Sequence, residues 1–275
     1  MRSAANMPQR EITAVTAELI TGPGILVPID LHGINRGTLE TLVRIARLLD
    51  RSLLGLLLED VRLQQVADLP FTTEITLSGA RERSLLRDHL SRRHLLVDKD
   101  ARRLLNELAG RDRVALRFEH AAGSRLLSAL ARDGRLDIFF PARQRWQPLT
   151  RGSAAAGAAV RRLGIVLAQT AQDQQVLNIA RMLMHAGQVV ELYVLSSGPM
   201  EGDQLKALYH PGSRICVQAN LKCDQDSLSR LIRQSAYDLL LLPRDCAESM
   251  APQVLEDALD RSATQVLVIN EGDGS

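Results

Sequence analysis

The chain has 275 residues, of which 45% are apolar and 24% are charged, and its formal net charge is +2. This composition is typical of a soluble globular protein with about two domains, and the balanced charge disfavours a general nucleic-acid binder. A nucleic acid is therefore not expected as a partner. No stretch approaches the ~20 apolar residues of a membrane helix, so a membrane is not expected as a partner either. The three cysteines lack C-x-x-C spacing, which predicts reduced thiols and a cytoplasmic location.

Apolar runs and amphipathic segments alternate along the first half of the chain. Short apolar runs predict strands, and apolar residues at helical spacing predict helices. The predicted strands are 25–29, 53–58, 114–119 and 137–140, and the predicted helices are 36–49, 80–109 and 123–132. Ser124 precedes the last of these helices and is expected to cap it.

The second half repeats this alternation more completely. Its predicted strands are 163–168, 189–195, 214–219, 237–242 and 265–270, and its predicted helices are 173–186, 203–209, 224–235 and 249–261. The opening of each half has the same β-α-β pattern, which predicts a tandem α/β protein. An acidic residue, Asp30, ends the first strand of the first copy, whereas Gln169 stands at the corresponding place of the second.

This pattern predicts two doubly wound parallel-sheet units. The predicted division is an N-terminal extension (1–23), a first unit (24–141), a linker (142–162), a second, degenerate unit (163–270) and a tail (271–275). The linker is too short for a further helix and strand, so the first unit is expected to lack its last strand or to carry a shrunken one. We expect the units to pack together as an internal pseudo-dimer.

The segments 25–30, 54–60, 237–243 and 265–269 carry a resemblance to a known family. Their order, with an aspartate after the first strand, resembles the universal stress protein family in two tandem copies. The resemblance implies an adenine-nucleotide α-hydrolase-like fold. It also implies a stress-related function and ATP or AMP as the ligand of the first unit.

Family members that bind ATP use the acidic residue after strand one and a glycine-rich loop after strand four, whose N–H groups hold the phosphates. Only Asp30 matches here. Both loops after the predicted fourth strands begin with proline, at Pro141 and Pro243, and neither has the family's glycines. The second loop also contains Asp245 and Glu248, which would repel a polyphosphate.

The candidate ligand-binding residues follow the first and fourth strands of the first unit. Asp30 either contacts a ligand or caps a loop. His32, after Leu31, is either a nucleotide contact or general base, or a solvent-exposed loop histidine, which is the commoner situation. Arg143 and Arg145 either bind an anion in place of the missing glycines or form a solvated basic linker.

No catalytic or metal site is expected. The histidines lack H-E-x-x-H and Cys/His ligand spacing, and the chain has no G-x-S-x-G motif and no P-loop. The sequence therefore predicts a non-enzymatic regulatory module that senses an adenine nucleotide or docks a protein partner, with a homodimer as a further option. The alternatives are a nucleotide hydrolase on the same fold and a structural interaction module with both pockets inactive.

Overall fold

We describe a computed structural model of the chain, and it covers residues 23–30, 36–59, 65–75, 82–85, 87–132, 135–142, 160–200, 202–234 and 236–271. The first half forms β1 (Gly24–Ile29), α1 (Arg36–Leu48), β2 (Ser52–Glu59), β3 (Thr73–Ile75), β4 (Glu82–Ser84), α3 (Arg87–Asp112), β5 (Leu116–Ala122), α4 (Arg125–Leu130) and β6 (Leu136–Phe140). The second half forms β7 (Arg162–Leu167), α5 (Asp173–His185), β8 (Glu191–Ser196), α6 (Gly202–Leu208), β9 (Arg214–Gln218), α7 (Gln225–Arg233), β10 (Leu239–Pro243), α8 (Arg244–Glu248), α9 (Pro252–Asp260) and β11 (Gln265–Ile269).

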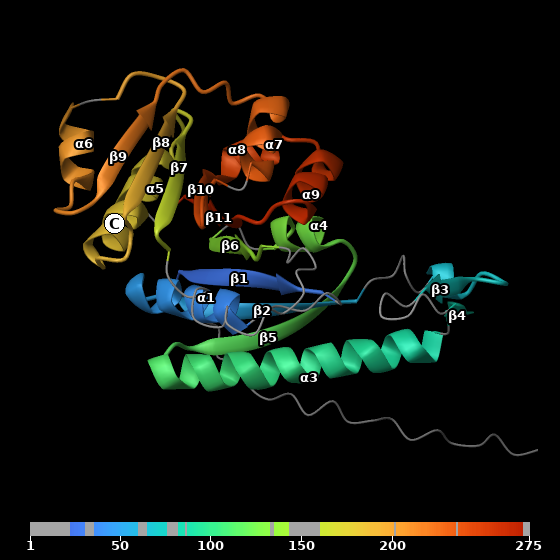
Figure 1. Ribbon diagram of the computed structural model, residues 1–275. Coiled ribbons are helices and arrows are strands. Elements are labelled where there is room, and N and C mark those ends of the chain that lie inside the picture. The colour runs from blue at the N-terminus through green and yellow to red at the C-terminus, as the bar shows by residue number, and fades with distance from the viewer. Residues whose placement is uncertain are drawn as a thin grey trace, which may run out of the picture.

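One sheet runs through both halves of the chain (Figure 1). It has nine strands in the order β5-β2-β1-β6-β11-β10-β7-β8-β9. Neighbouring strands are parallel except at the centre, where β6 and β11 are antiparallel, with Phe139 opposite Leu267. The sequence predicted two separate sheets. The structure corrects this, because β11 pairs with β6 at the edge where a further strand of the first half would lie.

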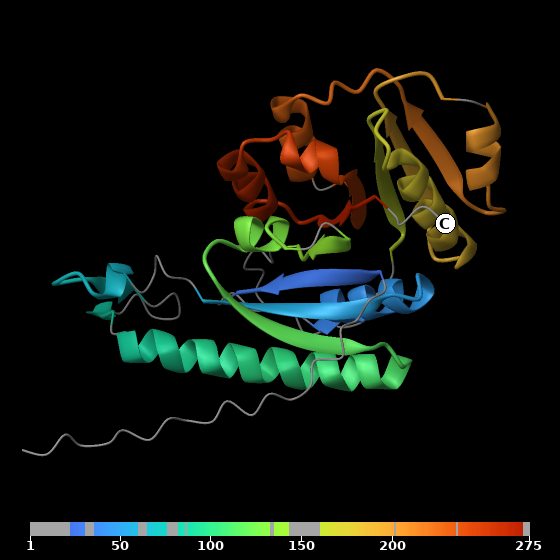
Figure 2. The same ribbon diagram turned by 180° about the vertical axis from the view of Figure 1, so that it is seen from behind.

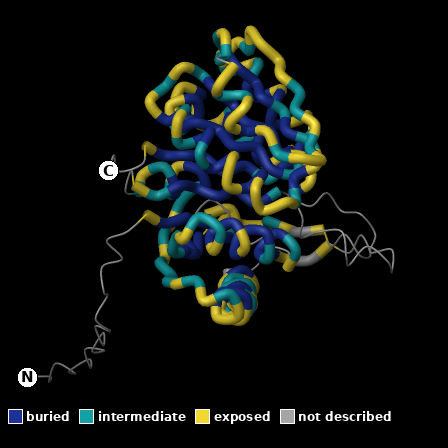
Figure 3. The backbone as a smooth tube through the Cα atoms, turned by 90° about the vertical axis from the view of Figure 1, so that its left-hand side faces the viewer, coloured by how far each residue is buried: buried dark blue, intermediate teal, exposed yellow. Residues whose placement is uncertain are grey.

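Helices cover both faces of the sheet, as continuous apolar strands require. Alternate residues of each strand point to opposite faces, so β1 sends Val27 to one core and Leu26 to the other. The first core is completed by α1, α3, α5 and α6, and the second by α4, α7, α8 and α9. Figure 3 shows the buried residues along the sheet and the exposed ones on the outer turns of the helices.

Polar contacts join the two halves beside the antiparallel strands. The buried carboxylate of Asp137 forms an ion pair with Arg51 and accepts a hydrogen bond from Asn270 N at 2.9 Å. On the second face, Arg125 of α4 forms an ion pair with Asp260 of α9 at 3.1 Å. These contacts link β2, β6 and α4 of the first half to residues at the end of the chain.

An arm projects beyond the sheet from the first half. It consists of residues 65–75 and 82–85 with the N-terminal part of α3, 87–98, and its β3–β4 hairpin lies past the ends of the large strands (Figures 1 and 2). Leu85 and Leu90 are buried. By contrast, Phe71 is fully exposed, in a left-handed conformation with φ of 66°.

Each strand predicted from the sequence is present in the structure, with ends that differ by a few residues. One predicted helix was wrong at its start, and one helix was not predicted. The predicted helix 80–109 starts only at Arg87, because residues 82–84 pair with 73–75 in a hairpin. The short helix α8 was missed, since a single turn of helix is too short to show an apolar repeat.

Candidate functional site

Open parallel sheets bind ligands at a place called the topological switch point, and each half of this sheet has one. In such a sheet a ligand lies beyond the carboxyl ends of the strands, at the point where the strand order reverses. The first switch point lies at the ends of β1 and β6, and the second at the ends of β7 and β10. Because β6 and β11 are antiparallel, the strands of the two halves run in opposite directions, and the two switch points lie at opposite ends of the strands.

Asp30 lies at the first switch point, as the sequence predicted. It follows Ile29, the last residue of β1, and is half-buried. Phe140 ends the adjacent strand β6 and is followed by Pro141 and Ala142. The other predicted contacts, Leu31, His32, Arg143 and Arg145, lie outside the described residues. Asp30 therefore follows one strand of the neighbouring pair β1 and β6, and Pro141 and Ala142 follow the other.

Gly123 and Ser124, after β5, form a helix cap. Gly123 has a φ of 126°, and the hydroxyl of Ser124 accepts a hydrogen bond from Leu127 N at 3.2 Å. This confirms Ser124 as the N-cap of α4. Since α4 has only six residues and its cap is internal, these residues do not form an anion site.

The second switch point contains an internal anion. Asp173, the first residue of α5, accepts hydrogen bonds from Ala168 N at 3.1 Å and Gln169 N at 2.8 Å. It also accepts one from the hydroxyl of Thr170 at 3.1 Å. The backbone N–H groups that could hold a phosphate at this turn therefore already donate to a carboxylate.

Glutamine side chains fill the space around that turn. Gln169 has a φ of 60°, and its side chain lies over Gly198, where a Cβ atom would come within 2.2 Å of its Nε2. Gln172 is buried, and its Nε2 donates to the carboxylate of Asp245 at 2.9 Å. These contacts link the β7–α5 turn to α8 and to the loop after β8.

Arg244, the first residue of α8, does not supply positive charge to the second switch point. Its Nη2 donates to the backbone oxygen of Leu130, at the end of α4, at 2.8 Å, and its Nε pairs with Glu248. Asp173 and Asp245 thus leave this end of β7 and β10 with two carboxylates, and a polyphosphate would be repelled there.

Two thiols complete the second switch point. Cys223 precedes α7 and is partly exposed, and Cys246 lies in α8 and is buried. Burial raises the pKa of Cys246 to about 12 and also raises the pKa of Cys223. Both thiols are therefore protonated near neutral pH, and neither is an activated nucleophile.

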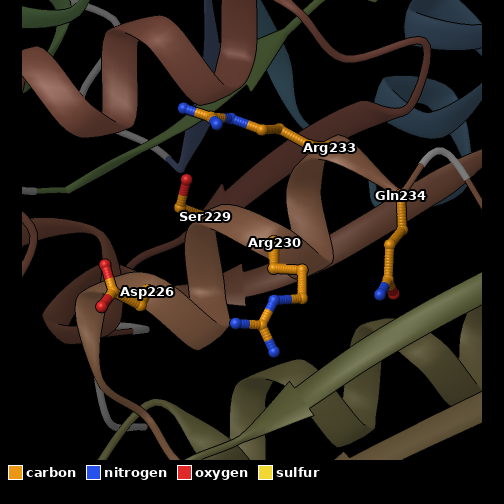
Figure 4. Close-up of a pocket in the computed structure, with 5 residues that line it drawn as sticks. All are labelled: Asp226, Ser229, Arg230, Arg233 and Gln234. Atoms are coloured by element: carbon orange, nitrogen blue, oxygen red, sulfur yellow. The ribbon is translucent and has the colours of Figure 1, made fainter.

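Two surface depressions lie along helices of the second half. One, of about 370 Å³, lies along α7 and is lined by Asp226, Ser229, Arg230, Arg233 and Gln234. Figure 4 shows Arg230 and Arg233 pointing in different directions, and Arg233 forms an ion pair with Asp257. The two arginines therefore do not converge on one ligand. A second depression, of about 230 Å³, lies between α5 and α6.

The described residues contain no cluster of three or more His, Cys, Asp or Glu side chains that could hold a metal ion. None of their helices is long and apolar enough to cross a membrane.

The sequence did contain a sign of the filled second switch point. Thr170 and Asp173 have the S/T-x-x-D/E spacing of a capping box, which directs an acidic side chain back onto the preceding backbone. Nothing in the sequence indicated the contact between Gln172 and Asp245, because these residues are far apart along the chain.

A comparison with protein-family models finds no match, and no curated protein matches the chain either.

Proposed function

We propose that this protein is a non-catalytic regulatory module of the universal stress protein type, cytoplasmic and stress-related, that senses a ligand through its first switch point alone. The observation that carries the proposal is the carboxylate of Asp173. It occupies the N–H donors of the second switch point, at 2.8 and 3.1 Å. Asp30, at the corresponding place after β1, leaves the first switch point as the candidate binding site.

The strand order supports a tandem origin of the two halves. The first half contributes β5-β2-β1-β6, and the second contributes β9-β8-β7-β10 with β11 added. If the strands of the large sheet are numbered in chain order within each half, both halves have the order third, second, first and fourth. A duplicated unit that lost its fifth strand in the first copy accounts for this order and for the pairing of β6 with β11.

The proposed ligand is an adenine nucleotide, ATP or AMP. Asp30 would contact it at the end of β1. Leu31 and His32 follow Asp30 directly and would line the same site. Arg143 and Arg145, three and five residues after the end of β6, would supply the positive charge that the missing glycine-rich loop cannot.

A nucleotide hydrolase is the competing function, and the site chemistry disfavours it. Hydrolysis needs positioned charge on the transferring phosphoryl group. Pro141, directly after β6, and Pro243, the last residue of β10, offer no N–H there, and the helix that follows Pro243 adds Asp245. We expect no phosphate release above a no-protein control with Mg²⁺ or Mn²⁺. Release that scales with protein concentration and disappears in Asp30→Ala would instead establish the hydrolase.

Titration calorimetry of the full-length protein with ATP and with AMP tests the proposal. We expect saturable binding of at least one of the two nucleotides with one site per chain. Two sites per chain would contradict the filled second switch point. No binding of either nucleotide would contradict the sensing function and favour the structural interaction module.

A second candidate function, docking of a second copy of this chain, is favoured by the arm. Of the large apolar side chains that are exposed among the described residues, six lie on the arm: Val66, Leu69, Phe71, Ile75, Leu95 and Leu96. Their exposed fractions range from 42% to 100%. Several exposed apolar side chains on one part of a protein are typical of an interaction site.

The charges of the arm favour another copy of itself as the partner. Arg92 and Arg93 are exposed on α3, and neither forms an ion pair within the described structure. Glu82 carries the opposite charge on the hairpin side of the same arm, where it also accepts a hydrogen bond from the Thr73 hydroxyl at 2.8 Å. Two arms related by a twofold axis would place the helix of one copy against the hairpin of the other.

Sedimentation velocity over a range of protein concentrations tests this pairing. We expect dimers that Phe71→Ser weakens, because Phe71 is fully exposed and its loss leaves the monomer fold intact. Tyr209→Ser is the control, since Tyr209 is 64% exposed outside the arm. A monomer at all concentrations, or equal weakening by both variants, would contradict pairing through the arm.

A further inference from the structure

A groove lies between two neighbouring helices of the second half. α5 and α6 pack against each other over the first core, and the groove between them has a volume of about 230 Å³. Its floor is apolar, because Leu177 and Leu208 line it and are only 8% and 1% exposed. Pockets for drug-sized ligands have roughly 300–1,000 Å³, so a ligand of this groove is a smaller molecule.

Three polar side chains of α5 form a row along one wall of the groove. Gln174, Asn178 and Arg181 are spaced by four and three residues, which places them on one face of the helix. The amide oxygen of Asn178 accepts long hydrogen bonds from Gln174 Nε2 and from Arg181 Nη2, each at 3.4 Å. Because arginine can only donate, the oxygen of Asn178 faces it, and the Asn178 NH2 group, which bonds to no described residue, remains available as a donor.

The groove also has a positive charge that the described chain does not neutralise. Arg181 is exposed and forms no ion pair with a described residue. Asp203, the acidic residue among those that line the groove, pairs instead with Lys206 at 2.8 Å. An apolar floor is therefore combined with a guanidinium that has no counter-charge within the described structure.

We propose that this groove is a binding site for a small monocarboxylate with a short aliphatic chain. The guanidinium of Arg181 has parallel N–H groups that match the two oxygens of a carboxylate. The NH2 group of Asn178 donates to one of these oxygens. The aliphatic chain lies over Leu177 and Leu208 and removes apolar surface from water. This site does not depend on Asp30 and is therefore independent of the proposed nucleotide site.

The charges around the groove favour a ligand with one negative charge over a ligand with two. Asp203 stands on the opposite helix, and its ion pair with Lys206 joins side chains that are 89% and 80% exposed. Such an exposed pair is weak, so the carboxylate of Asp203 still repels a second anionic group in the groove. A dicarboxylate or a doubly charged phosphate ester is therefore a poorer ligand than a monocarboxylate.

Methyl NMR spectra of the full-length protein, recorded with increasing sodium butyrate at constant pH and ionic strength, test the proposal. We expect saturable shifts of the methyl signals of Leu177 and Leu208. Butyramide has the same chain without the charge, and it should bind about tenfold more weakly because the charge-assisted hydrogen bonds are lost. Succinate, which carries two charges, should also bind more weakly than butyrate.

Variants of exposed residues separate the groove from the rest of the surface. Arg181→Gln should weaken butyrate binding about tenfold. Arg230→Gln is the matched control, since Arg230 is an exposed arginine of α7 that lines the other depression, and it should leave the Kd for butyrate unchanged. Asp203→Asn should raise the affinity for succinate toward that for butyrate.

Three results would overturn the proposal. The absence of any saturable shift with butyrate would show that the groove is not a carboxylate site. Equal affinity for butyrate and butyramide would show that the groove does not recognise charge. Equal weakening by Arg181→Gln and Arg230→Gln would show a general attraction of anions to the surface. None of these results bears on nucleotide binding, which Asp30→Ala tests separately.

Discussion

At the scale of residues, one carboxylate distinguishes the two halves of the sheet. Asp30 directly follows β1, whereas the uncharged residues Ala168 and Gln169 follow β7, and Asp173 supplies an acidic group four residues after Gln169. The position of Asp30 could be predicted from the sequence, because an acidic residue directly after an apolar run is a local pattern. The contacts of Gln172 and Gln169 could not, since they depend on residues from α8 and from the loop after β8.

The ion pair between Arg51 and Asp137 is the most deeply buried charge contact described, with side chains that are 8% and 1% exposed. Asp137→Ala would leave the Arg51 guanidinium buried without its counter-charge. We expect a loss of about 3–5 kcal/mol in the free energy of unfolding, measured in urea. Asp137→Asn should lose less, because its amide oxygen continues to accept from Asn270 N. Equal loss from both variants would show that charge is unimportant here.

At the scale of elements, apolar periodicity predicted most helices because their buried faces decide where they form. The N-terminal part of α3 lies outside this rule. Leu95 and Leu96 are exposed there, so a run rich in leucine and arginine did not reveal that residues 82–84 form a strand. The helix α8 could not be predicted for a different reason: a single turn is too short to contain an apolar repeat.

The two ends of α3 differ in what they contribute to folding. Leu108 is fully buried against the sheet, whereas Leu95 is 69% exposed on the arm. We expect Leu108→Ala to lower the free energy of unfolding by about 2–5 kcal/mol. The matched change Leu95→Ala should alter it by no more than about 0.5 kcal/mol. A large loss from Leu95→Ala in the monomer would contradict the exposed position of the arm.

The N-cap of α7 links the stability of the second half to pH. Asp224 accepts a hydrogen bond from Ser227 N at 2.8 Å, and this bond is the main reason why its pKa is lowered. A lowered pKa means that the carboxylate stabilises the fold above its unfolded pKa of about 3.9. That stabilisation is lost as the pH falls through the lower, folded value.

Asp224→Ser separates the cap from its titration. The serine hydroxyl still accepts from the helix N–H but has no charge to lose in acid. Thermal melts between pH 2 and pH 7 should therefore show a shallower acid decline for Asp224→Ser than for the wild-type protein. Asp224→Ala should be less stable than both near neutral pH. An unchanged acid decline in the serine variant would contradict the assigned role.

At the scale of the whole molecule, the main departure from the sequence prediction is the single sheet. Each strand of the large sheet could be predicted from its own apolar run, but the pairing of β6 with β11 could not. These strands lie at the ends of the two halves, and the register between distant strands depends on packing and leaves no local pattern. The buried contacts of Asp137 with Arg51 and Asn270 fix that register from both sides.

A shared sheet predicts that the two halves unfold together. Hydrogen exchange measured by mass spectrometry in increasing denaturant should show the amides of β2 and β8 converging on one opening free energy. Asp137→Ala should lower the protection of both strands by the same amount, although β8 is far from the substitution. Loss of protection in β2 alone would show that the halves are independent folding units.

The central claim is that ligand binding belongs to the first switch point and not to the second. Titration calorimetry with ATP and AMP on the wild-type protein, Asp30→Ala and Gln169→Ala tests it most directly. We predict that Asp30→Ala weakens binding at least tenfold, because it removes the acidic group at the end of β1. Gln169→Ala should leave the Kd unchanged. Equal loss from both variants, or loss from Gln169→Ala alone, would contradict the claim.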